Sequence, residues 1–169
     1  HAVREITSHI LNRGTKPAYI GVTELDIAAG QSRHTGFLDA CAEKNLEVPK
    51  KAQMESDFSV DAAYLACERL LDVYPEVDTI VCASDSIAFG TITCLREFGR
   101  SVPEDVQVTG VGDSDLSKVI TPSLTTIHHH YKTSGMEAAK MLIGAMDKED
   151  TIVRDIRMGY ELLLRNSTR

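Results

Sequence analysis

The chain has 169 residues, of which 43% are hydrophobic and 25% charged, a composition that suits one compact domain and excludes a wholly disordered chain. Its formal net charge of −7 and scattered basic residues exclude a surface built for nucleic-acid phosphates. No Cys-x-x-Cys pair and no apolar run of 18 residues occurs, which excludes that metal or redox motif and a membrane-spanning helix.

The first part of the chain alternates helix and strand signals. Val3, Ile6 and Ile10 recur at helical spacing and predict a helix that ends near Gly14. A short buried strand follows at residues 18–22. Residues 30–46 predict a second helix, and residues 52–55 predict a second strand.

The same alternation continues through the middle of the chain. Ser59 is placed to cap a helix that Pro75 terminates, and residues 79–83 form an apolar run typical of a strand covered on both faces. Ser84 or Asp85 then caps a helix that stops at Gly99, before a strand at residues 106–111. Such alternation predicts an α/β fold with a doubly wound parallel sheet and right-handed crossovers.

The alternation breaks after residue 111. Residues 124–129 are predicted to be extended, and apolar residues from Met136 to Met146 mark another helix. Residues 147–150 predict a turn, and residues 152–164 predict a final strand or hairpin arm. The four cysteines lie in apolar segments and are expected to be free, buried thiols of a protein in a reducing cytosol: Cys41, Cys67, Cys82 and Cys94.

Polar residues follow the predicted strands, where open parallel sheets bind ligands. Arg33 lies in the first turn of a helix after the first strand, and Phe58 follows the second strand. Ser84 and Asp85 follow the third strand, and Asp113 follows the fourth. A guanidinium, carboxylates and an aromatic ring suit a polyhydroxylated ligand, because they supply paired donors, acceptors and an apolar platform.

Each of these residues also has a simpler interpretation. Arg33 suits a helix surface, Phe58 a core, Asp85 a helix N-cap and Asp113 a turn. The run from His128 to His130 does not predict a metal site, because neighbours on an extended segment point to opposite faces. The dinucleotide fingerprint, the phosphate-binding loop and the Gly-x-Ser-x-Gly elbow are missing, so we expect neither an enzyme nor a cofactor.

Six segments carry a resemblance that spans nearly the whole chain. They are HILNRGTKPAYIGV, RHTGF, ASDSIAFG, VPEDVQVTGVGDSD, ITPSLTTI and LLLRNS. Their order and spacing resemble the LacI/GalR family of transcriptional regulators, and GVGDSD with VITPSLTTI is similar to sucrose-operon repressors. The resemblance implies a periplasmic-binding-protein-like effector domain of two lobes, present here without a helix-turn-helix DNA-binding headpiece and most of its first lobe.

The resemblance also implies a division of the chain and a set of ligand contacts. Residues 1–127 correspond to the second lobe, residues 128–150 to a crossover and first-lobe helix, and residues 151–169 to a return strand and tail. The positions matching the family's effector-contacting residues are Arg33, Phe58, Ser84, Asp85, Asp113, His129 and Tyr131. Gly112 stands where one of two acidic residues is often found, which leaves open which hydroxyls are recognised.

The function that the resemblance implies is sugar sensing by a cytoplasmic, homodimeric regulator that contacts operator DNA through its headpiece. Whether the sugar acts as inducer or corepressor is open. The alternative is a transport-linked sugar-binding protein of the same fold. The upstream sequence distinguishes the two, because a regulator has a helix-turn-helix there and a transport protein has a signal peptide. A third hypothesis, an enzyme or phospho-acceptor with Asp85 or Asp113 as the reactive acid, lacks an activating lysine, base or metal cluster near those acids in the sequence.

Overall fold

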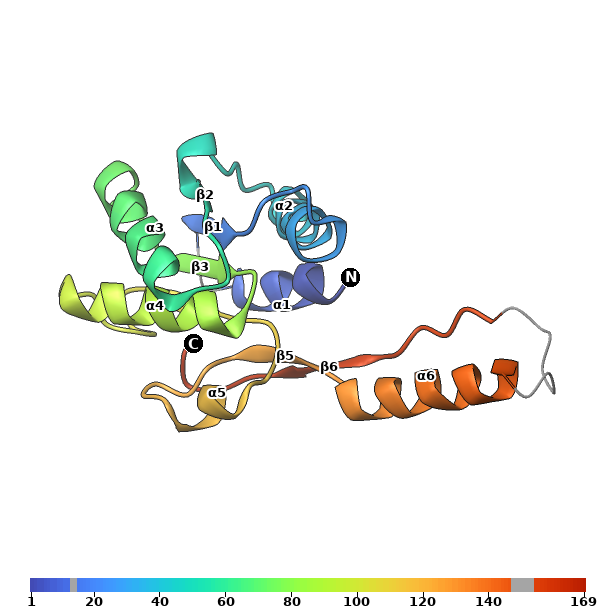
Figure 1. Cartoon of the computed structure of the whole chain (residues 1–169). Helices are drawn as coiled ribbons and strands as arrows, with labels where there is room; N and C mark the ends of the chain where they lie inside the picture. Colours follow the sequence, from blue (N-terminus) through green and yellow to red (C-terminus); the bar gives the residue numbers. More distant parts are fainter. Residues whose placement is uncertain (13–14, 147–153) are drawn as a thin grey trace.

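A four-stranded parallel sheet lies at the centre of the fold in the computed structural model, which describes residues 1–12, 15–146 and 154–169. The strand order is β2-β1-β3-β4, from Gln53–Glu55, Pro17–Gly21, Thr79–Cys82 and Gln107–Thr109 respectively. Every residue of β1, β3 and β4 is buried, because helices cover both faces of the sheet. The predicted doubly wound α/β fold is therefore confirmed (Figure 1).

Two pairs of helices cover the two faces of this sheet. Helices α1 (Ala2–Ile10) and α2 (Ser32–Glu43) pack together on one face. Helices α3 (Val60–Val73) and α4 (Asp85–Glu97) pack together on the other (Figure 1). The predicted Ser59 cap is confirmed, because its hydroxyl accepts a hydrogen bond from the Ala62 N–H at 3.2 Å.

The second half of the chain adds a short helix, a two-stranded sheet and a long helix. Helix α5 (Asp115–Val119) precedes β5 (Thr126–His129), which pairs antiparallel with β6 (Tyr160–Leu163). A parallel bridge from Thr109 to Thr125 attaches this unit to the edge strand β4. The unit therefore extends the main sheet rather than forming a separate layer.

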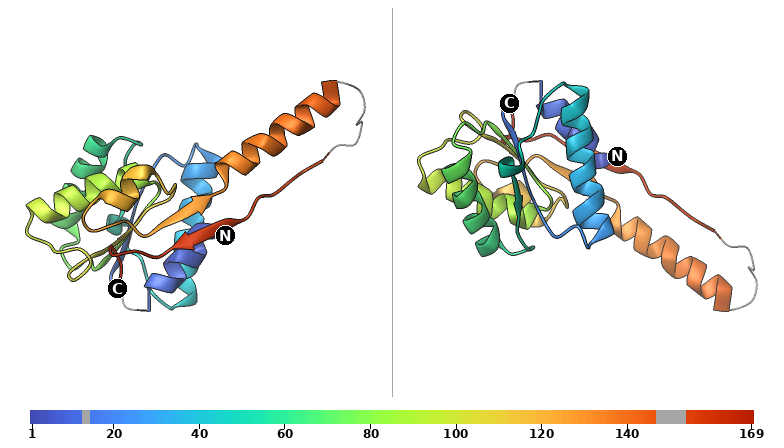
Figure 2. Two further views of the ribbon diagram at one scale, coloured as in Figure 1. Left: turned by 90° about the horizontal axis from the view of Figure 1, so that it is seen from below. Right: turned by 90° about the horizontal axis from the view of Figure 1, so that it is seen from above.

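Helix α6 (Tyr131–Met146) extends away from the body of the domain, as Figures 1 and 2 show. It has no buried residue, and its apolar side chains are largely exposed, from 48% for Met136 to 73% for Met146. Apolar side chains on a helix ordinarily pack against another element. Nothing in the described part of the chain covers this helix.

Several boundaries differ from the predicted ones. A five-residue π-helical turn, η1 (Ile27–Gln31), precedes α2, and the Asp26 carboxylate accepts hydrogen bonds from the N–H groups of Ala28 and Ala29. A short 3-10 turn, η2 (Lys50–Ala52), takes the start of the predicted second strand. The predicted strand at 106–111 is longer than β4, which ends at Thr109; beyond it, Gly110 and Gly112 donate to the carbonyls of Thr125 and Ile127.

The C-terminal strand is shorter than predicted. The final strand covers only β6, so residues 154–159 lie outside regular structure, and the predicted strand or hairpin arm at 152–164 was too long. Gly14, the turn at 147–150 and residues 152–153 lie outside the described residues.

All four cysteines are buried and free, as predicted. Within the described ranges, no helix has the length and apolar character needed to traverse a bilayer.

Candidate ligand-binding site

A cavity of 290 Å³ lies where α1, the start of α2, the end of β4 and the β5–β6 pair meet. Part of its lining comes from η1, α2, the segment after β4, and β5: Ala28, Ser32, Arg33, Val111, Ile127 and His129. The cavity combines apolar walls with a few polar groups. That combination is typical of small-molecule sites.

Arg33 connects α2 to the carboxyl end of β3. Its Nη1 donates a hydrogen bond to the Ala83 carbonyl at 2.5 Å, immediately before Ser84. A guanidinium carries five N–H donors, and the others of Arg33 make no hydrogen bond to the described residues. Arg33 is therefore held at one point and presents further donors to the cavity.

His129 is the second polar group of this cavity. Burial lowers the pKa of His129 below its usual value, and the positive charges of Arg33, His128 and His130 lower it further. The ring is consequently neutral at pH 7, with one donor and one acceptor nitrogen. Tyr131, which is 59% exposed, packs edge-on against His129 with ring centroids 5.7 Å apart. The structure thus brings Arg33, His129 and Tyr131 into one region.

Ser84 and Asp85 hold the start of α4. The Ser84 hydroxyl accepts from the Ile87 N–H at 3.3 Å, so Ser84 is the N-cap and Asp85 is the first helical residue. Asp85 is only 4% exposed, and its two oxygens accept from the Thr126 hydroxyl at 2.5 Å and the Ser114 N–H at 2.7 Å. Asp85 therefore joins α4 to β5 and the start of α5, and each of its oxygens already accepts a hydrogen bond.

Asp113 lies on the other side of β5 from the Arg33 cavity. Its carboxylate contacts the Arg165 guanidinium at 2.5 Å and His128 Nδ1 at 3.0 Å, with the Lys118 ammonium at 3.8 Å. His128 and His129 point to opposite faces because side chains alternate along a strand. Asp113 and Arg33 consequently do not line one cavity among the described residues.

Phe58 lies outside both the core and the Arg33 cavity. It is 50% exposed, which contradicts its interpretation as a core residue. Leu25 and Ile27, which follow β1, are 91% and 71% exposed. The carboxyl edge of the sheet thus presents an apolar rim made by Leu25, Ile27 and Phe58.

Several residues that line this cavity were not predicted from the sequence. Ala28 and Ser32 line the cavity because η1 brings the chain around before α2, and no residue pattern indicated a π-helical turn. Ile127 could have been predicted from the sequence, since strand alternation places it on the same face as His129. Tyr160 also lines the cavity, through the antiparallel pairing of β6 with β5.

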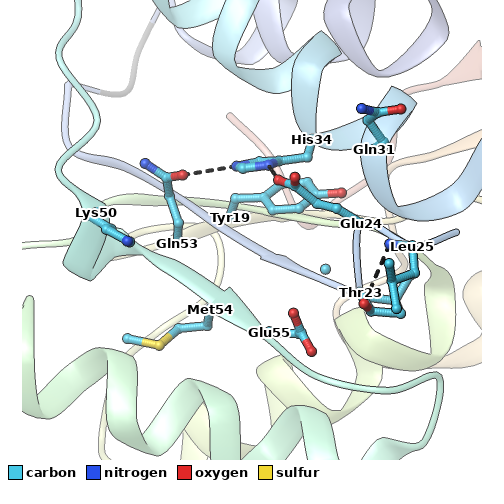
Figure 3. Close-up of a pocket in the computed structure, with 12 residues that line it drawn as sticks. Tyr19, Thr23, Glu24, Leu25, Gln31, His34, Lys50, Gln53, Met54 and Glu55 are labelled. Atoms are coloured by element: carbon cyan, nitrogen blue, oxygen red, sulfur yellow. Dashed lines mark hydrogen bonds and ion pairs between the residues drawn. The ribbon is translucent and has the colours of Figure 1, made fainter. Parts of the chain in front are cut away.

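A second and larger cavity, of 530 Å³, lies between α2 and the edge strand β2 (Figure 3). Tyr19 of β1 and His34 of α2 stack in its wall, with ring centroids 4.9 Å apart. None of the predicted site residues lines this cavity.

Comparison with known proteins identifies relatives of the chain. Residues 7–168 match the periplasmic binding protein-like domain family. The HTH-type transcriptional repressor PurR of Actinobacillus pleuropneumoniae serotype 3 (strain JL03) is 33% identical over 165 residues, covering 96% of this chain and 49% of that protein. The HTH-type transcriptional regulator CelR of Thermobifida fusca is 29% identical, covering 97% and 48%. The chain spans about half the length of the curated relatives it matches.

Solved structures agree with these matches. A complex of the transcriptional regulator CelR with cellobiose superimposes with a TM-score of 0.91 and 29% identity, covering 98% of this chain and 50% of that chain. The transcription regulator GntR from Chromobacterium violaceum superimposes with a TM-score of 0.90 and 26% identity, covering 99% and 62%.

Proposed function

Because the chain belongs to the periplasmic binding protein-like domain family, in the form found in LacI-type transcriptional regulators, we propose that it senses a small-molecule effector for such a regulator. The observation that carries this proposal is the cavity lined by Arg33 and His129 near the carboxyl ends of β3 and β4. Ligands of open parallel sheets bind at that edge.

We propose that the effector is a sugar. The guanidinium of Arg33 supplies donors and the neutral ring of His129 supplies a donor and an acceptor, which suit adjacent hydroxyls. Tyr131 and Phe58 are exposed aromatic rings able to cover the apolar face of a sugar. Ser84, Asp85 and Asp113 stay in the proposed set as residues that support the rim, since each already has protein partners. The cellobiose complex of the related CelR supports this ligand class.

We further propose the division of the chain into residues 1–127 as one lobe, 128–150 as crossover and first-lobe helix, and 151–169 as return strand and tail. The uncovered apolar side chains of α6 support this division, because they need another surface in the parent protein. Sugar binding between the lobes would shift the population of DNA-competent homodimers. Operator DNA would be contacted by a headpiece outside these 169 residues, in the cytoplasm.

The regulator interpretation is preferred to a transport-linked binding protein, because the matched relatives are transcriptional repressors and regulators. Those relatives likewise support a binding domain rather than an enzyme. We propose no cofactor for this site.

The proposal is tested by calorimetry on the full-length parent regulator with cellobiose, sucrose and a purine base. We expect heat from at least one sugar. We expect Arg33→Ala to weaken binding of that sugar about tenfold or more. The reason is that a hydrogen bond from a charged group contributes about 1.5–3 kcal/mol, and this variant removes it. Arg96→Ala, which removes an exposed guanidinium at the end of α4, is the matched control and should leave affinity unchanged. Heat from the purine and none from any sugar would overturn the sugar assignment.

A further inference from the structure

The cavity between α2 and the edge strand β2 is separate from the Arg33 cavity. No residue lines both, and its walls come from β1, the loop after β1, α2 and β2. At 530 Å³ it is also the larger of the two. Such a volume accommodates a small metabolite.

The buried hydroxyl of Tyr19 has no partner in the wall of this cavity. Tyr19 is 3% exposed, and its hydroxyl forms no hydrogen bond with the described residues. Burial raises the pKa of Tyr19 well above its usual value, so the hydroxyl keeps its proton. A buried hydroxyl without a partner destabilises the protein, and a ligand atom in hydrogen-bonding contact would relieve that cost.

Gly21 and Glu24 lie next to this hydroxyl. A Cβ on Gly21 would lie 2.9 Å from the hydroxyl and 2.2 Å from a ring carbon, so Gly21 lies directly against the ring. Figure 3 shows Glu24 beside the hydroxyl end of the ring. The Glu24 side chain is 62% exposed and contacts His34, so a ligand reaches the hydroxyl only by displacing Glu24 from that contact.

His34, Glu24 and Gln53 form a connected wall above the cavity (Figure 3). His34 Nδ1 lies 2.6 Å from Glu24 Oε1, and Nε2 lies 2.9 Å from Gln53 Oε1. Gln53 Nε2 in turn donates to the Val48 carbonyl at 3.2 Å, which sets the orientation of its amide. Both partners of His34 are acceptor oxygens, so its ring donates to both only when both nitrogens carry a proton; the same ring stacks on Tyr19.

Two charged side chains of the cavity have no such partner. Lys50 and Glu55 line it from opposite ends of the segment that contains β2, and neither forms an ion pair or hydrogen bond with the described residues. Figure 3 shows the ammonium of Lys50 and the carboxylate of Glu55 on different sides of the cavity. The cavity therefore offers one free cation and one free anion.

We propose that this cavity binds a small zwitterion, a molecule with a protonated amine and a carboxylate such as an amino acid. Its carboxylate contacts Lys50, its amine contacts Glu55, and one of its polar atoms reaches the Tyr19 hydroxyl. Charge-assisted contacts of this kind are stronger than neutral ones. A sugar fits less well, because the Tyr19 ring already stacks with the rings of His34 and Phe37. The residues that line this cavity are distinct from those that line the sugar site proposed above.

The test is calorimetry on this chain with two zwitterions, 4-aminobutanoate and 6-aminohexanoate. The comparison compounds are butane-1,4-diamine, succinate and butane-1,4-diol. Each has the four-carbon length of 4-aminobutanoate but different end groups. We expect one zwitterion to bind at least fivefold more tightly than each comparison compound. Binding of neither zwitterion, or equal binding of the diol, would overturn the proposal.

Variants locate the binding. Tyr19→Phe removes a hydroxyl without a protein partner, so folding is kept while zwitterion affinity falls at least fivefold; Glu55→Gln should act similarly. Glu104→Gln is a matched control outside the cavity and should leave affinity unchanged. Arg33→Ala should also leave it unchanged. Loss of zwitterion binding in Arg33→Ala would assign the ligand to the other cavity, and unchanged affinity in Tyr19→Phe and Glu55→Gln would equally overturn the assignment.

Discussion

The carboxylate of Asp113 lies 2.5 Å from the guanidinium of Arg165, a residue 52 positions further along the chain. Arg165 also donates to the Ser117 hydroxyl and the Leu124 carbonyl, at 2.8 and 3.0 Å. Asp113 itself has a positive φ of 52°. This contact fastens the end of the chain to the corner after β4, and so holds β6 beside β5.

Removing this contact should destabilise the domain in a pH-dependent way. Burial disfavours the Asp113 carboxylate, but the hydrogen bond and charge of Arg165, with Lys118 and His128, outweigh burial and lower its pKa. Its stabilisation is therefore present above the unfolded value of about 3.9 and is lost as pH falls through the folded value. We expect Asp113→Asn to lower the free energy of unfolding at pH 7 by about 1–3 kcal/mol.

Urea denaturation at pH 7 and at pH 3 measures this effect. The difference between wild type and Asp113→Asn should shrink at the lower pH. Asp115→Asn is the matched control, because the Asp115 side chain is fully exposed and, within the described ranges, pairs only with Lys118 at 3.7 Å. A difference that is equal at both pH values would contradict the linkage.

Asp85 should be a structural residue. Asp85→Ala removes the acceptor for the Thr126 hydroxyl and the Ser114 N–H, and should cost about 2–4 kcal/mol. Thr126→Val should cost less, and the double variant should cost less than the sum of the two, because both changes remove one shared hydrogen bond. A double-mutant cycle of urea midpoints measures this coupling. Strict additivity would show that the hydrogen bond contributes nothing.

His129 should make stability depend on pH near neutrality. Its pKa is lowered in the folded protein, by burial first and then by neighbouring positive charge, so folding favours the neutral ring. The full contribution is present above the unfolded pKa of about 6.5 and decreases as pH falls from there towards the folded value. His129→Gln should flatten the stability curve below pH 6.5, measured by thermal unfolding. The exposed His9→Gln should leave the shape of the curve unchanged.

Helix α6 should contribute little to the stability of this chain. Leu142 is 63% exposed, so Leu142→Ala should change the free energy of unfolding by about 0.5 kcal/mol or less. Leu95 is fully buried in α4, and Leu95→Ala should cost about 2–5 kcal/mol. In the full-length parent, Leu142→Ala should become as costly as a core substitution. An unchanged, small effect there would contradict the proposed first-lobe position of α6.

The sequence determined the wound α/β order, because the apolar spacing that specifies each helix and strand is local. The helix after residue 30, the strand at residues 79–82 and the Ser59 cap follow from such spacing. Strand alternation also predicted that neighbouring histidines point apart, and His128 and His129 do. The family resemblance came from the order of six motifs along the chain, which needs no coordinates.

Only the tertiary structure decided which polar residues are free to bind. Asp85 and Asp113 follow strands as ligand-binding carboxylates do, yet their oxygens are occupied by Thr126 and by Arg165, respectively. The Arg165 contact spans 52 positions, and no local pattern reports a contact of that range. The unpartnered hydroxyl of Tyr19 was equally invisible, because whether a buried hydroxyl is satisfied depends on the packing of α2 against β1 and not on neighbours in sequence.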